Sequence, residues 1–138
     1  MDAIIIQKYK EYFKSVFDFM VKNGFTKMPY PKIVLDNTDQ HNSIFMKTGY
    51  FDPDNNLIKI YIHDRAFKDC VRSFCHECIH YRQHLDGAIE KSGYNSDKIT
   101  EDKNLIGLEK EAYLKGNIAF RSWTEIEQKN KEIKNKKR

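Results

Sequence analysis

The chain has 138 residues, of which 40% are hydrophobic and 32% charged, and this composition excludes a mainly disordered protein and fits one folded domain. Its formal net charge of +4 equals the charge of residues 127–138, so the body is neutral and the overall charge does not argue for nucleic-acid binding. Because the sequence has no run of roughly 20 apolar residues and no secretory signal, we expect a cytoplasmic protein that does not enter a membrane.

The first part of the chain predicts a helix followed by a strand. Apolar side chains recur at i, i+3 and i+4 over residues 5–21, which is the spacing of an amphipathic helix, and Asn23-Gly24 is a stop signal. Two prolines then favour an extended backbone that leads into a short buried strand over residues 32–36.

Two further strands are expected to form a hairpin. Residues 43–51 are predicted as the second strand and residues 57–62 as the third. The sequence Asp-Pro-Asp-Asn-Asn at positions 52–56 is typical of a turn. It lacks the glycine and the distal glutamate of a calcium-binding loop, so we interpret it as a turn alone.

The second half of the chain predicts two helices. Helical spacing extends over about residues 67–85 and again over about residues 105–123, with a polar connection between them. The basic segment 127–138 is predicted to be a frayed or disordered tail, which leaves a single domain over residues 1–126. Three clustered cysteines are a poor disulfide framework and lie on an apolar helix face, so we interpret them as core residues of a protein from a reducing compartment: Cys70, Cys75 and Cys78.

The sequence His76-Glu77-Cys78-Ile79-His80 lies within the predicted helix 67–85. Four residues advance a helix by about 400°, so His76 and His80 lie one turn apart on one face, which is the spacing that two imidazoles need to bind one zinc ion. Glu77 lies roughly 100° further round the helix axis. From there its carboxylate can reach a water molecule in the open coordination position of the metal, as a general base does. The alternative is a pair of surface histidines without a metal.

A third ligand has to come from elsewhere in the chain. No histidine follows His84, and His84 itself continues a straight row with the other two, so we interpret it as a helix-surface residue or a partner of a ligand. Glu109 lies on the apolar face of the last helix, whereas Glu111 lies on its exposed face. Because a carboxylate on a core face is costly unless it is paired or metal-bound, we predict Glu109 as the third ligand. Ala112 and Gly116 would let the two helices approach closely.

These residues resemble the zincin metallopeptidases of the glutamate-zincin type, in which H-E-x-x-H on one helix is completed by a glutamate on the next, three residues before an alanine. The resemblance covers about residues 32–123. It implies an α+β, zincin-like fold with an N-terminal helix, a small three-stranded and mostly antiparallel sheet, the H-E-x-x-H helix and a C-terminal ligand-bearing helix. Some small proteins of this type are encoded by phages, which makes the virion an alternative location. The residues that match the pattern are His76, Glu77, His80, Glu109 and Ala112.

The resemblance also implies an activity, that of a hydrolase with one Zn²⁺ per chain and a peptide or protein substrate. Glu77 would take a proton from the attacking water and pass it to the leaving amine. Many relatives have an aspartate near the position of Tyr113 that orients a ligand histidine, a role for which Asn117 or a backbone carbonyl is the candidate here. An extended substrate would add to the sheet edge near residues 43–50. Candidates for the group that stabilises the transition state are Tyr113, Tyr81, His84 and Arg121.

A second hypothesis is a zincin-shaped binding or structural protein that is catalytically weak or inactive. Such a protein would keep the metal for folding, while the basic tail would engage a polyanion such as a nucleic acid. The simpler interpretation of the tail is a solubilising terminus, and we therefore do not expect nucleic acid as a partner.

Overall fold

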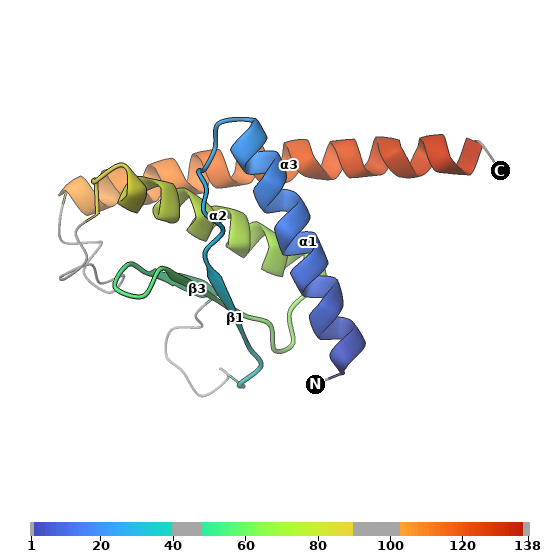
Figure 1. The fold of residues 1–138 in the computed structure, drawn as a ribbon, viewed down its shortest axis with the longest axis horizontal. Helices are drawn as coiled ribbons and strands as arrows, with labels where there is room; N and C mark the ends of the chain where they lie inside the picture. Colours follow the sequence, from blue (N-terminus) through green and yellow to red (C-terminus); the bar gives the residue numbers. More distant parts are fainter. Residues whose placement is uncertain (1, 40–47, 90–102, 137–138) are drawn as a thin grey trace.

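The computed structural model describes residues 2–39, 48–89 and 103–136, and in these ranges the chain forms three helices and one three-stranded sheet (Figure 1). This arrangement confirms the predicted α+β class and the predicted order of elements. Figure 1 shows that α2 lies between the sheet and α3. The elements are α1 (Ala3–Lys22), β1 (Lys32–Asp36), β2 (Gly49–Asp52), β3 (Leu57–Tyr61), α2 (Phe67–Leu85) and α3 (Lys103–Lys136).

Helix α1 ends at the stop signal that its sequence predicts, and Asp2 caps its first turn. The Asp2 side chain accepts a hydrogen bond of 2.9 Å from the backbone N–H of Ile4, which satisfies one free donor of the first turn. The helix ends at Asn23, and Gly24 follows with a φ of +79°, a left-handed conformation that glycine adopts without steric cost. The apolar face packs on α2, where the rings of Phe13 and Phe74 stack with centroids 4.3 Å apart.

The sheet has the strand order β1-β3-β2. Strand β2 pairs antiparallel with β3, which confirms the predicted hairpin, but β1 pairs parallel with β3. The expectation of a mostly antiparallel sheet is therefore wrong for one of the two pairings, because β3 lies between β1 and β2 and runs in the direction of β1. The described part of the second strand is Gly49–Asp52, and the predicted positions 43–47 lie outside the described residues.

The connection between β2 and β3 is a turn, as its composition predicts. The Asp52 carboxylate accepts hydrogen bonds from the Asp54 backbone N–H at 3.0 Å and from the Asn55 side-chain amide at 2.8 Å. Asn56 follows with a φ of 49°. These internal hydrogen bonds use the carboxylate oxygens that a calcium loop would direct at the ion.

Helix α2 forms the centre of the fold, because it contacts the sheet on one side and both other helices. Its apolar face includes three free cysteines that are fully buried, which confirms that they are core residues: Cys70, Cys75 and Cys78. Burial raises the pKa of the Cys75 and Cys78 thiols, so both are held in the unreactive protonated form.

Helix α3 is longer than its hydrophobic pattern predicts. The apolar pattern predicts this helix to about Trp123 and leaves residues 127–138 as a frayed helix or a disordered tail, and in the structure residues 127–136 continue the helix. The i, i+4 spacing of Glu127 with Lys131 and of Glu132 with Lys136 favours a helix there without any apolar contact. Among the described helices, none combines the length and apolar character needed to cross a membrane.

Candidate metal centre

The candidate site lies where α2 faces α3. The Nε2 atoms of His76 and His80, one turn apart on α2, lie 2.7 Å and 3.0 Å from the two carboxylate oxygens of Glu109 on α3. One potential ligand atom from each of the three residues lies within 4.8 Å of the others. In the part of the chain that the structure describes, this is the one group of three such residues that could hold a metal ion. The structure thus brings together the three predicted ligands.

The site is partly buried, and its three side chains interact electrostatically. The His80 side chain is only 2% exposed, and those of His76 and Glu109 are 16% and 21% exposed. Burial alone would raise the pKa of Glu109, but hydrogen bonds with His76 and His80 lower it to about 2. Burial opposes the charged form of His80, yet Glu109 and Glu77 raise its pKa. An anionic carboxylate therefore faces two imidazoles at neutral pH.

The donor set fits a metal ion. Two imidazole nitrogens and one carboxylate are a ligand set of catalytic zinc sites, in which a fourth position stays open for water or substrate. Comparison with protein-family models, curated proteins and solved structures finds no match. The fit to a metal ion rests on the three side chains and on their convergence, because a partly buried carboxylate and two ring nitrogens surround a place where a cation would be stabilised.

The close approach of α3 to α2 depends on two small residues, as the sequence predicts. Ala112 is fully buried, and a Cβ atom at Gly116 would lie 3.0 Å from Cα and 3.1 Å from the backbone nitrogen of His76. The backbones of the two helices therefore touch at this point. Glu109 lies two turns before Gly116, so this contact sets the distance of its carboxylate from the histidines.

Replacing Gly116 by alanine is expected to lower the melting temperature and to weaken zinc binding. The new Cβ would meet backbone atoms of His76, which cannot rotate away, so α3 must shift and carry Glu109 with it. Overpacking costs about 1–3 kcal/mol, and this exceeds the gain of up to about 1 kcal/mol from removing a glycine within a helix.

The matched control is Gly107→Ala in the same helix. A Cβ atom at Gly107 would meet nothing within 4 Å, so the gain in helix propensity stands alone and the control is expected to be at least as stable as the wild type. Melting curves with and without zinc measure both variants. Equal behaviour of the two would show that the helices do not depend on a close contact at Gly116.

Glu77, the predicted general base, lies on the side of α2 that faces the sheet. It is only 6% exposed, and its carboxylate accepts a hydrogen bond from the backbone N–H of Phe51 in β2. Burial raises the pKa of Glu77, while His80 and His76 lower it to a smaller extent. A carboxylate with a raised pKa beside two metal ligands is suited to accept and return a proton near neutral pH.

Sequence reasoning did not single out Gln83, which the structure places against a predicted ligand. Its side chain is buried, and its Oε1 lies 2.8 Å from Nδ1 of His80. Asn117 or a backbone carbonyl was predicted to orient a ligand histidine, but Asn117 is exposed on the outer face of α3 and does not hold His80. The i, i+3 spacing of His80 and Gln83 on one helix is the signal that could have identified this contact.

Glu111 is the second residue that the structure places differently. The sequence placed it on the exposed face, in no need of a cation, but the Arg82 guanidinium donates to Oε1 and the Lys115 ammonium lies 3.0 Å from Oε2. Gln83 donates to the same carboxylate at 2.9 Å. The hydrogen bond from Gln83 and the two cations lower the pKa of Glu111.

The remaining candidates fall into two groups. Tyr113 lies beside the site, because its ring centroid is 4.4 Å from that of His76 and its side chain is exposed. Tyr81 is buried and donates to the backbone carbonyl of Pro29 at 2.7 Å, and His84 faces the carbonyl of Ile89 at 3.1 Å, so neither points at the ligands. Arg121 is exposed about 12 Å along the helix from Tyr113.

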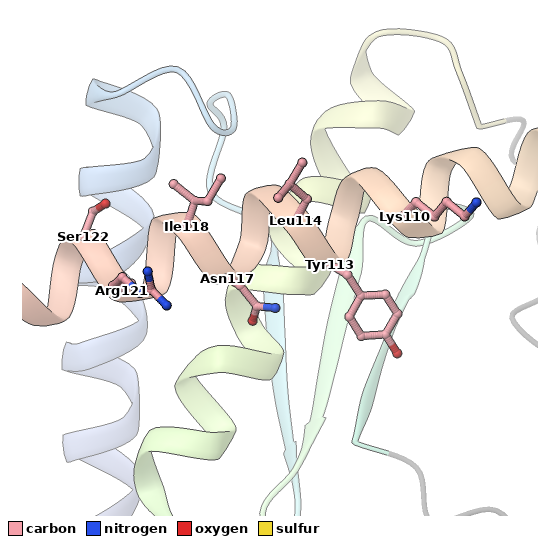
Figure 2. Close-up of a pocket in the computed structure, with 7 residues that line it drawn as sticks. All are labelled: Lys110, Tyr113, Leu114, Asn117, Ile118, Arg121 and Ser122. Carbon is pink, nitrogen blue, oxygen red and sulfur yellow. The ribbon is translucent and has the colours of Figure 1, made fainter.

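Asn117 and Arg121 instead line a shallow pocket along the outer side of α3, together with Tyr113 (Figure 2). In Figure 2 the Tyr113 hydroxyl points away from the side chains of Leu114 and Ile118, which lie on the opposite side of the helix. Tyr113 is therefore the one predicted transition-state candidate that the structure places against a ligand.

Proposed function

We propose that this protein is a zinc-dependent metallopeptidase of the zincin type. The observation that carries the proposal is the convergence of two imidazoles of α2 and one carboxylate of α3, with the buried carboxylate of Glu77 next to them in the chain. The α+β arrangement, with a hairpin directly before α2, supports a zincin-like fold.

The roles of the residues follow from their positions. A bound zinc ion would polarise the peptide carbonyl and lower the pKa of a water molecule. Glu77 takes the proton from the attacking water and later delivers it to the leaving amine, a transfer that its raised pKa favours. The Tyr113 hydroxyl, exposed beside His76, is the group that would donate a hydrogen bond to the developing oxyanion.

The proposed substrate is an extended peptide, since an edge strand lies next to the site. Strand β2 pairs with β3 on one side and, through the N–H of Phe51, contacts Glu77. A peptide that adds to a sheet edge gains main-chain hydrogen bonds without regard to its sequence. Such a peptide along β2 would bring its scissile bond towards Glu77 and the three ligands.

The test is cleavage of an unfolded protein by the wild type before and after chelation. We expect cleavage to stop when the metal is removed and to return with about one equivalent of Zn²⁺ per chain. Cleavage that persists under chelation would contradict the proposal. Bound zinc without any cleavage would instead favour the metal-holding binding protein.

A further inference from the structure

We propose that Gln83 is the positioning residue of the metal centre, and that it couples the two ligand-bearing helices by holding His80 of α2 and the backbone around Glu109 of α3 at the same time. This inference rests on the proposed metal site and concerns residues outside the ligand set. Gln83 is 2% exposed, and both ends of its amide are engaged.

The orientation of the Gln83 amide is determined by its neighbours on α3. The nitrogen Nε2 lies 2.9 Å from the carbonyl oxygen of Leu108 and 2.9 Å from a carboxylate oxygen of Glu111. Both neighbours are acceptors, so they require the NH₂ end of the amide, and a flipped amide would place oxygen against oxygen at both contacts. The amide oxygen must therefore face His80.

This orientation determines the tautomer of His80. Because Oε1 of Gln83 can only accept, Nδ1 of His80 at 2.8 Å must carry the hydrogen. Nε2, which hydrogen-bonds to a carboxylate oxygen of Glu109 at 3.0 Å, is then the ring nitrogen left to give up its hydrogen and bind a metal. A ligand histidine held in this way is oriented and made more basic before a metal arrives.

The same contacts connect the ligand helices. Leu108 and Glu111 lie on either side of Glu109 in α3, so the two hydrogen bonds of Gln83 hold the segment that carries the third ligand. Glu111 is itself held by Arg82 and Lys115. These two cations balance the negative charge of Glu111, which keeps its carboxylate in place as an acceptor for the Gln83 amide.

The test is the zinc affinity of Gln83→Leu, measured by competition with a chelator. This change removes the acceptor for His80 and the donor to α3, and leucine fills about the same space. We expect zinc to bind about 10–100-fold more weakly. Tyr81→Phe is the matched control, because it removes another buried hydrogen bond of α2 that points to Pro29. The control is expected to lower stability but to keep the zinc affinity of the wild type.

A reciprocal pair of variants provides a rescue. Gln83→Glu keeps an acceptor for His80 but directs an oxygen at Glu111, and is expected to bind zinc weakly. Adding Glu111→Gln supplies a donor at that contact and is expected to restore part of the affinity. A role of Gln83 in packing alone would not produce this recovery, and melting curves of the metal-free proteins show that each variant is folded.

The outcomes separate this inference from the proposed function. A folded Gln83→Leu that binds zinc like the wild type, or a Tyr81→Phe that loses as much affinity, overturns the positioning role. Wild-type protein that binds zinc but cleaves nothing overturns the peptidase proposal, while the affinities still decide the role of Gln83. Wild-type protein that binds no zinc overturns both.

Discussion

Glu77→Gln is expected to bind zinc as the wild type does and to lose peptide cleavage by about 10²–10⁴-fold, the range that a general base contributes. Glu77 is not part of the three-ligand group, so the substitution leaves the ligands in place. The glutamine oxygen can still accept the hydrogen bond from the Phe51 N–H, but the amide cannot take a proton from water.

The same variant is expected to be at least as stable as the wild type in the metal-free state. Burial raises the pKa of Glu77, which means that the folded protein disfavours its charge. A neutral amide of equal size removes that cost. Loss of activity together with unchanged or higher stability distinguishes a chemical role from a folding defect.

The measurement is turnover per bound zinc, with Asp69→Asn as the control. Asp69 is an exposed carboxylate in the first turn of α2, and its ion pair with Arg72 at 3.5 Å lies on the surface. The control is expected to keep full activity. Retention of turnover by Glu77→Gln would assign the base to another residue.

Glu109→Gln is expected to weaken zinc binding by more than about 100-fold, because it removes the anionic ligand itself rather than a partner of a ligand. The control is Glu125→Gln, which removes an exposed carboxylate from the same helix. Metal content per chain, measured on protein purified without added zinc, should fall in the first variant and stay unchanged in the second. Zinc content that does not depend on Glu109 would place the third ligand elsewhere.

The pH dependence of folding stability, measured on the metal-free proteins, is a second test of Glu109→Gln. The pKa of Glu109 is lowered to about 2 from an ordinary value of 4.5, so its stabilising effect is fully present above pH 4.5 and is lost as the pH falls towards 2. The pKa of His80 is raised from 6.5, so its contribution is fully present below pH 6.5 and is lost as the pH rises through the higher value of the folded state. The stability difference between wild type and Glu109→Gln is therefore expected to be largest between about pH 4.5 and 6.5.

The sequence by itself determined the parts of this protein that depend on contacts close in the chain. The periodicity of an α-helix places His76 and His80 on one face, and the structure confirms that their Nε2 atoms meet the same carboxylate. The sequence also favoured Glu109 over Glu111 as the third candidate ligand. Only Glu109 interrupts the apolar face of its helix, where an uncompensated charge is costly. Zinc, peptide cleavage and the zincin fold stay predictions.

Only the tertiary structure decided the features that join distant segments. The parallel pairing of β1 with β3 depends on which strand lies between the other two, and no local pattern encodes that order. Whether the chain stays helical beyond Trp123 was left open by the sequence, because charged residues at i, i+4 support the helix there without an apolar stripe. The contacts of Gln83 with α3 were missed because its partners Leu108 and Glu111 are 25 and 28 residues away. Helical geometry acts over one turn, whereas these hydrogen bonds exist only once α3 packs on α2, so they follow from the assembled fold.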